Sequence, residues 1–414
     1  MMKILHTSDW HLGQSLHQYD RTYEHERFLE WQLDTLVSES VDVLVIAGDI
    51  FDNSNPSAMA QSLLYRFLTE ARSRVPHLNI VMTAGNHDSP GRLEAPSPFL
   101  SLFDAHVVGQ VSRSEEGISL ERLVLPLKGR DGRIGAWCIA MPFLRPSDVP
   151  RVEDATNPYA EGIEELYRQA IEFAQAKREA GQALIALGHC HLTGGKTSED
   201  SERRIVIGGA EALSVEMFDD SINYVALGHL HLPQEIGGNP TRRYSGSPLP
   251  MSFSEIDYPH QVVLIELDGD KVSAIRELRV PRTVDLLRVP NKPAALDAVL
   301  ALLSELDLPE RPEAEWPYLQ VRVHLTEPEP SLRVQIEATL QGKPVRLARI
   351  ETSYDRGEEG ESAPAVSIDE LNALAPADFF TRLYQHRFGQ PAPKELLNAF
   401  TELLSSTEET EATA

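Results

Sequence analysis

Five times along the chain, a short apolar run ends at a glycine or another small residue, and side chains that can bind a metal ion follow directly. Such runs predict buried strands. In an open α/β sheet, ligands gather on short loops beyond the carboxyl ends of the strands. Glycine lets these loops approach closely without a Cβ clash. The side chains are, in chain order, Asp9 and His11; Asp49; Asn86, His87 and Asp88; His189 and His191; His229 and His231. The sequence therefore predicts a sheet whose rim carries a site for two metal ions.

The order of strand-like and helix-like segments predicts the domain organisation. Their alternation over residues 1–281 predicts an α/β domain, a layered β-sandwich flanked by helices. Its helices are expected at 23–38, 58–74 and 160–180, where apolar residues recur at helical spacing. A small α+β unit is expected at 282–352, with strands at 284–289, 318–325 and 345–350 and helices at 293–306 and 332–341. Beyond it we expect a linker at 353–366, short helices at 367–405 and a disordered tail at 406–414.

Composition restricts the class of protein. No apolar run approaches the roughly 18 to 20 residues of a membrane span, and the amino terminus enters a strand without a signal-like segment. The two cysteines, Cys138 and Cys190, are too few for a disulfide framework. We therefore expect a cytoplasmic protein with no membrane association.

The net charge of −25, from 38 basic and 63 acidic residues, argues against a free-standing nucleic-acid binder. Phosphate neutralisation dominates the affinity of such proteins, and they usually have a basic surplus. Two features could offset this acidity. Bound divalent metals are the largest local charges in a site, and a partner subunit could carry the basic surface.

The candidate ligands can be divided between two ions. Asp9 and His11 leave a strand two positions apart and can converge on one ion. Asp49 can bridge both, because the two oxygens of a carboxylate can serve metals roughly 3.5 to 4 Å apart. Asn86 offers an amide oxygen to the second ion, and the imidazoles of His189, His229 and His231 complete the two sets. Mixed imidazole, carboxylate and amide ligation suits Mn, Fe or Zn better than Mg or Ca.

His87 is left without a metal to bind. It lies where an imidazolium could stabilise charge on a phosphorane or protonate a leaving oxygen. Asp52 and Asp88 could orient a ligand or could simply cap their loops, and the role of His191 stays open in the same way. A single Asp or His after a strand is about as often a loop cap as a ligand. The recurrence of the same context five times is what favours a metal site.

These motifs resemble a known superfamily. Asp9-Trp10-His11, Gly48-Asp49, Gly85-Asn86-His87-Asp88, Gly188-His189 and Gly228-His229-Leu230-His231 together resemble the calcineurin-like metallophosphoesterases. Residues 6–13, 85–89 and 245–248 are more narrowly similar to the branch that contains double-strand-break repair nucleases. The resemblance extends over nearly the whole chain.

The resemblance implies a site and an activity. Asp9, His11, Asp49 and His231 would hold one ion, and Asp49, Asn86, His189 and His229 the other. His87 would be catalytic, and the two divalent ions would be manganese. The activity would be cleavage of DNA in repair and recombination, as an exonuclease on double strands and an endonuclease on single strands and hairpins.

The resemblance also implies partners. Residues 282–352 would be a capping domain that contacts DNA, and residues 367–405 would dock the coiled coil of an ATPase subunit. The chain would form a homodimer within a heterotetramer.

Two alternatives stay open at this point. A phosphomonoesterase or cyclic-nucleotide phosphodiesterase would have the same metal rim, but it has no need of the extra unit and the apolar terminal helices. An inactive scaffold would retain the fold, but it would be free to lose ligands, and here the ligand set and His87 are complete.

Overall fold

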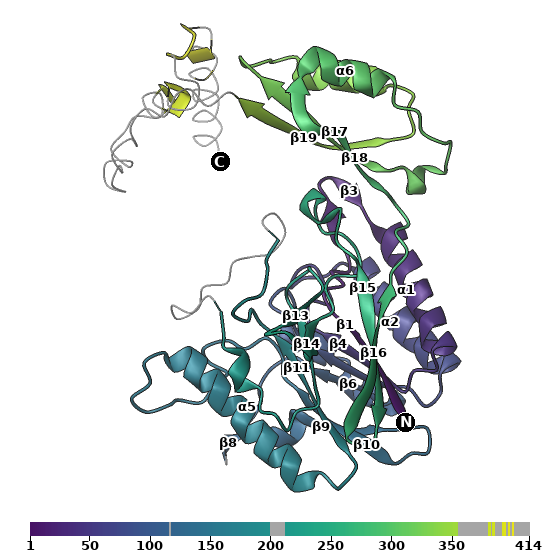
Figure 1. The fold of residues 1–414 in the computed structure, drawn as a ribbon, viewed down its shortest axis with the longest axis vertical. Helices are drawn as coiled ribbons and strands as arrows, with labels where there is room; N and C mark the ends of the chain where they lie inside the picture. The colour runs from purple at the N-terminus through teal and green to yellow at the C-terminus, as the bar shows by residue number, and fades with distance from the viewer. Residues whose placement is uncertain are drawn as a thin grey trace, which may run out of the picture. The chain divides into compact units, whose positions relative to one another are not determined.

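The computed structural model of the chain describes residues 1–115, 117–198 and 212–354, with scattered positions between 380 and 400. They form two compact units, one of residues 1–286 with 312–315 and one of residues 287–311 with the chain from 316 onward. Figure 1 shows both units. Within the described residues, no helix combines the length and the apolar character that a membrane crossing requires.

The first unit contains two six-stranded sheets. One has the order β16 (Lys271–Arg279), β15 (Gln261–Asp268), β1 (Met2–Thr7), β4 (Val43–Ala47), β5 (Asn79–Thr83) and β6 (Ala105–Val108). The other has the order β13 (Gln234–Ile236), β14 (Asn239–Tyr244), β12 (Tyr224–Gly228), β11 (Ala183–His189), β10 (Ile134–Ala140) and β9 (Val124–Lys128). β1, β4, β5 and β6 run parallel, as do β10, β11, β12 and β14. The carboxyl ends of four strands therefore meet at one edge of each sheet.

Helices cover the outer faces of the two sheets (Figure 1). Side chains alternate between the faces of a strand, so Val43 and Val45 of β4 face the second sheet while Leu44 and Ile46 pack with the helices α1 (Thr22–Ser38) and α2 (Ala58–Arg74). The helix α5 (Pro158–Lys177) packs on the second sheet. Shorter elements are β2 (Ser15–Leu16), β3 (Tyr19–Asp20), α3 (Pro90–Glu94), α4 (Ser97–Leu100), β7 (Arg113–Ser114) and β8 (Gly117–Ile118), with 3₁₀ turns at Ser101–Phe103, Leu120–Arg122, Val215–Met217 and Phe253–Glu255. The predicted helix-flanked β-sandwich is confirmed.

The second unit is a three-stranded sheet with two helices. Its elements are β17 (Leu286–Ala295), α6 (Leu296–Ser304), β18 (Tyr318–Leu325), α7 (Leu332–Leu340) and β19 (Arg346–Tyr354). A 3₁₀ turn at Glu313–Glu315, between α6 and β18 in the chain, belongs to the first unit. Leu319, Val321 and Val323 of the central strand β18 pack against Val299 and Ile336 of the helices.

One predicted boundary in the second unit is wrong. The helix predicted from Pro293 starts only at Leu296, because residues up to Ala295 continue the strand β17. Proline has no backbone N–H and pushes the residue before it into an extended conformation, so this segment suits an edge strand. Most of the predicted linker, the terminal helices and the tail lie outside the described residues.

Candidate metal centre

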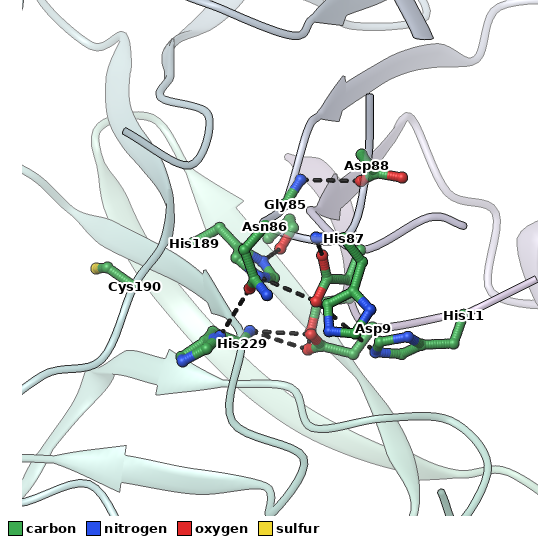
Figure 2. Close-up of polar contacts among 12 residues, drawn as sticks. Asp9, His11, Gly85, Asn86, His87, Asp88, His189, Cys190 and His229 are labelled. Atoms are coloured by element: carbon green, nitrogen blue, oxygen red, sulfur yellow. Dashed lines mark hydrogen bonds and ion pairs between the residues drawn. The ribbon is translucent and has the colours of Figure 1, made fainter. Parts of the chain in front are cut away.

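The predicted ligands come together where the carboxyl edges of the two sheets meet. Figure 2 shows Asp9, His11, Asn86, His189 and His229 gathered around one point, with Cys190 pointing away from it. Three sets of side chains have potential ligand atoms within 4.8 Å of one another: Asp9, His11 and His231; Asp49, His189 and His229; and His11, Asp52 and His87. The first two sets are buried. The structure thus assembles residues that are up to about 220 positions apart in the sequence.

The backbone at the rim is strained in a way that the sequence did not indicate. Asp9, His11, Asp49 and His229 have φ values of 52°, 46°, 48° and 101°, in the left-handed region that side chains other than glycine rarely adopt. Such a conformation costs on the order of 1–3 kcal/mol and persists only where the surroundings hold it. Here the Asp9 N–H donates to Gly48 O and the His11 N–H donates to Asp49 O, both at 3.0 Å.

The glycines before the ligands allow the loops to meet. A Cβ on Gly48 would overlap the imidazole of His189, and one on Gly85 would overlap the carboxylate of Asp49. On Gly228 it would overlap the carbonyl oxygen of Ala47. The prediction that glycine permits this close approach is confirmed at all three positions.

The first set is held by contacts from both sheets. Both oxygens of Asp9 accept the backbone N–H of His229, at 3.0 and 3.1 Å, and Ser8 donates its hydroxyl to the same carboxylate. His231 Nδ1 lies 2.8 Å from a carboxylate oxygen of the fully buried Glu255, so Nδ1–H donates and this contact orients the ring. His11 Nε2 is buried without a hydrogen-bond partner among the described residues. An unpaired nitrogen buried beside carboxylates is where a cation would bind.

The second set surrounds the side-chain oxygen of Asn86. This oxygen lies 3.0 Å from His189 Nε2 and 3.0 Å from His229 Nδ1. His189 Nδ1–H donates to the carbonyl of Ala47 at 2.8 Å, which turns Nε2 toward the site and within 3.3 Å of Asp49 Oδ2. The same Asp49 oxygen is 3.7 Å from His11 Nε2 of the first set. Asp49 therefore lies between the two sets.

Opposite charges dominate the electrostatics of the centre. Burial raises the pKa of Asp49, but the neighbouring charge of His189, a hydrogen bond from it and the charge of His11 lower this pKa well below its usual range. Burial lowers the pKa of His189, but Asp49 raises it to about 9. For His229, burial and the charge of His189 both hold the pKa well below its ordinary value. Both shifts favour an ionised Asp49 and a protonated His189, and a metal ion that binds here would displace the His189 proton.

The three residues whose roles stayed open have distinct environments. Asp88 accepts the backbone N–H groups of Ile50, Phe51 and Gly85 at 3.1, 2.9 and 2.9 Å, so it fastens the loop of Asp49 to that of Asn86. The Asp52 carboxylate lies 3.3 Å from His11 Nδ1 and can orient that ring. His191 belongs to none of the three sets of described residues.

His87 differs from the imidazoles of the two buried sets in being half-buried. Its Nδ1 lies 2.7 Å from the carbonyl oxygen of Asp52, so that nitrogen donates and the contact orients the ring. Its backbone N–H donates to Asp49 Oδ1 at 2.8 Å. The ring meets that of His11 edge-on, with centroids 4.9 Å apart. These contacts fix the imidazole beside the two buried sets.

Sequence reasoning missed Glu255. Its carboxylate accepts the Met251 N–H at 2.7 Å in addition to His231 Nδ1–H, and it is wholly buried. The only local signal was the spacing of Ser252 and Glu255, which is typical of a helix start. Carboxylates that hold the second nitrogen of a ligating histidine fix its tautomer and ring orientation.

Comparisons with known proteins agree with this geometry. The family profile described as calcineurin-like phosphoesterase matches residues 2–233. A second profile, described as the C-terminal domain of the type 5 capsule protein repressor, matches residues 282–388. Curated relatives named as the SbcD component of the nuclease SbcCD include one from Rhodobacter capsulatus, 40% identical over 92% of this chain and 94% of its own. The relative from Escherichia coli K12 is 30% identical over 97% of this chain and 98% of its own. The relative from Bacillus subtilis 168 is 32% identical over 99% of this chain and 100% of its own.

Proposed function

Since this chain belongs to the calcineurin-like phosphoesterases and, within them, to the SbcD family of metal-dependent nucleases, we propose that it cleaves DNA with two manganese ions. The observation that carries the proposal is the position of Asp49, 3.3 and 3.7 Å from one nitrogen of each buried ligand set. Two separate sets that share one carboxylate are the arrangement a two-metal hydrolase requires.

The donor set fits two divalent ions. The buried His11 Nε2, which has no hydrogen-bond partner among the described residues, would gain one in a metal ion. We assign Asp9, His11, Asp49 and His231 to one ion and Asp49, Asn86, His189 and His229 to the other. Imidazole and carboxylate ligands suit manganese, iron and zinc, and the family resemblance favours manganese.

The chain's own residues would prepare the phosphodiester for cleavage. Bound ions polarise the phosphoryl oxygens and lower the pKa of a bound water. Because His87 Nδ1 donates to the carbonyl of Asp52, the opposite nitrogen can carry a proton toward the scissile phosphate or its leaving oxygen. Asp88 holds the Asp49 and Asn86 loops together and so preserves the spacing of the two sets.

A cleavage assay tests the function. The metal-stripped protein is loaded with Mn²⁺, Mg²⁺ or Zn²⁺ and incubated with linear duplex, hairpin and single-stranded DNA, with p-nitrophenyl phosphate as the monoester control. We expect Mn²⁺-dependent cleavage of single strands and hairpins, with exonuclease action on duplex ends when an SbcC-like ATPase and ATP are present. Efficient turnover of the monoester without any DNA cleavage would favour the phosphatase alternative.

A first prediction concerns Glu255. The Glu255→Ala substitution frees His231 Nδ1, and loss of such a carboxylate typically lowers metal affinity by about 10- to 100-fold. Titration of the metal-free variant with MnCl₂ should show one weakened site and one unchanged site. Glu235→Ala, which removes an exposed carboxylate paired with Arg243, is the control and should leave both sites unchanged. Two unchanged sites in the Glu255 variant would mean that His231 needs no support from this carboxylate.

We further propose that residues 367–405 dock the coiled coil of an SbcC-like ATPase. Most of these residues lie outside the described part of the chain. The support is the sequence, in which apolar side chains recur at helical spacing after a Gly- and Glu-rich segment. Truncation after Pro364 should leave metal-dependent cleavage of single strands intact and abolish co-purification with the ATPase and stimulation by ATP. Retained co-purification would place the docking site elsewhere. A cytoplasmic location fits the two cysteines and such a partner.

We also propose a homodimer as the core of a heterotetramer with the ATPase. Three large apolar side chains close together in sequence, Phe99, Leu102 and Phe103, are 71%, 75% and 50% exposed. Clusters of this kind often mark a protein interface. The double substitution F99E and L102E should convert a dimer into a monomer in analytical ultracentrifugation, whereas the exposed substitution M59E should not. A monomeric native chain, or a double variant that remains dimeric, would refute this interface.

A further inference from the structure

We infer that Arg145 binds a phosphate of the DNA strand beside the metal centre, an inference that rests on the DNA nuclease function proposed above. Neither the ligand sets nor His87 would account for binding of the strand away from the scissile bond. Arg145 follows the strand β10, whose carboxyl end lies at the same edge as those of β11 and β12. The residue is therefore on a loop of the catalytic rim.

The loop that carries Arg145 forms part of the wall of the centre. The Phe143 N–H donates to the carbonyl of Ala84 at 2.8 Å, which ties this loop to the one carrying Asn86 and His87. The Phe143 ring is 9% exposed and meets the imidazole of His189 edge-on, with centroids 6.3 Å apart. Phe143 thus contacts His189, which we assign to the metal site.

The guanidinium of Arg145 lies over the Phe143 ring. Its central carbon is 5.6 Å from the centroid of the Phe143 ring, a distance at which a cation is attracted by the ring. The backbone below it is fixed, because the Arg145 N–H donates to Asp148 at 2.8 Å and the Tyr159 hydroxyl donates to Leu144 O at 2.7 Å. The half-buried side chain therefore extends from a rigid loop.

The charge of Arg145 is a further feature of this loop. Arg21, Arg74 and Arg168 form ion pairs with acidic residues, as expected in a chain with 63 acidic and 38 basic residues. Among the described residues, no carboxylate forms an ion pair with Arg145, and Asp148 accepts its backbone N–H instead. A planar guanidinium matches the geometry of a phosphate better than a lysine ammonium does. One unneutralised arginine at the rim would attract DNA locally in spite of the net charge of −25.

The alternative to phosphate binding is that Arg145 has a structural role and only packs on Phe143. Three variants separate the two roles. Arg145→Gln removes the charge, and Arg145→Lys keeps the charge without the planar fork. Lys128→Gln removes an exposed charge at the opposite edge of the same sheet, since Lys128 pairs with Ile134 at the start of β10. Each variant is assayed with Mn²⁺ on a fluorescein-labelled single-stranded oligonucleotide at increasing NaCl. Each is also assayed on bis(p-nitrophenyl) phosphate, which has no neighbouring phosphate.

For Arg145→Gln we expect an unchanged kcat and a KM for the oligonucleotide that is about tenfold higher at low salt, as for the loss of one charge-assisted hydrogen bond. The slope of log KM against log [NaCl] should fall by about 0.7, the value for one phosphate contact on a single strand. Arg145→Lys should retain the slope, Lys128→Gln should match the native protein, and hydrolysis of the small diester should be the same in all.

Two results would overturn the inference alone. One is an Arg145→Gln variant with native KM and native slope, whether or not its melting temperature falls. The other is an Arg145→Lys variant that loses the slope as Arg145→Gln does, because the contact would then not be one of charge. A native protein that hydrolyses the small diester but no DNA would instead overturn the proposed function.

Discussion

Replacing Asp49 with alanine should abolish DNA cleavage and lower the metal content from two ions per chain. Its Oδ2 lies 3.3 Å from His189 Nε2 and 3.7 Å from His11 Nε2, and its Oδ1 accepts the backbone N–H of His87. The substitution should therefore disturb both ions and the loop that carries His87. Two ions clamp the attacking and leaving oxygens of the phosphoryl group and contribute several kcal/mol. Each 1.36 kcal/mol is a factor of ten in rate. We therefore expect a loss of at least about 10³-fold in kcat.

Plasma mass spectrometry of the dialysed protein measures the metal content, and hydrolysis of single-stranded DNA measures the rate. Asp49→Asn keeps the shape of the side chain and separates loss of metal from misfolding, which thermal melting also monitors. Asp34→Ala removes an exposed carboxylate of α1 and is the matched control, with no change in either measurement. Two ions per chain together with normal cleavage would refute the bridging role.

The second large effect is expected at His87. His87→Gln should retain both ions and the affinity for DNA while kcat falls by about 10²- to 10³-fold, the typical cost of removing one preorganised group that stabilises transition-state charge. The structural basis is that Nδ1 is bound to the carbonyl of Asp52, whereas the opposite nitrogen is not required by either buried set. Glutamine can still donate a hydrogen bond to that carbonyl, which keeps the loop in place.

The same experiment decides whether His87 is a ligand. His87 also has a nitrogen within 4.8 Å of potential ligand atoms of His11 and Asp52, so a metal position there is the competing interpretation. Loss of an ion from His87→Gln would support that interpretation and would require a different mechanism. His191→Gln is the matched control, because it changes the same residue type at the rim outside these sets and should leave kcat unchanged.

Much of the fold could be predicted from local sequence. The helix at 58–74 was predicted with the bounds of α2, and the strand at 318–325 with those of β18. Apolar side chains at helical spacing, or in short runs between glycines, depend only on neighbours in the chain. The local pattern was misleading at Pro293, where it predicted the start of a helix. There the segment instead completes an edge strand of a sheet formed by distant residues.

The sequence by itself determined which side chains follow the strands, and hence that Asp, His and Asn side chains would gather at one rim. Only the tertiary structure decided which atom of each faces the site. His231 points Nε2 inward because Glu255, 24 positions away, holds Nδ1, and His189 does so because Ala47 of the other sheet accepts its Nδ1–H. Asp9, His11 and Asp49 adopt left-handed backbone that their own preferences oppose. Local sequence cannot encode these features, because hydrogen bonds and close packing between the two sheets supply the free energy that maintains them.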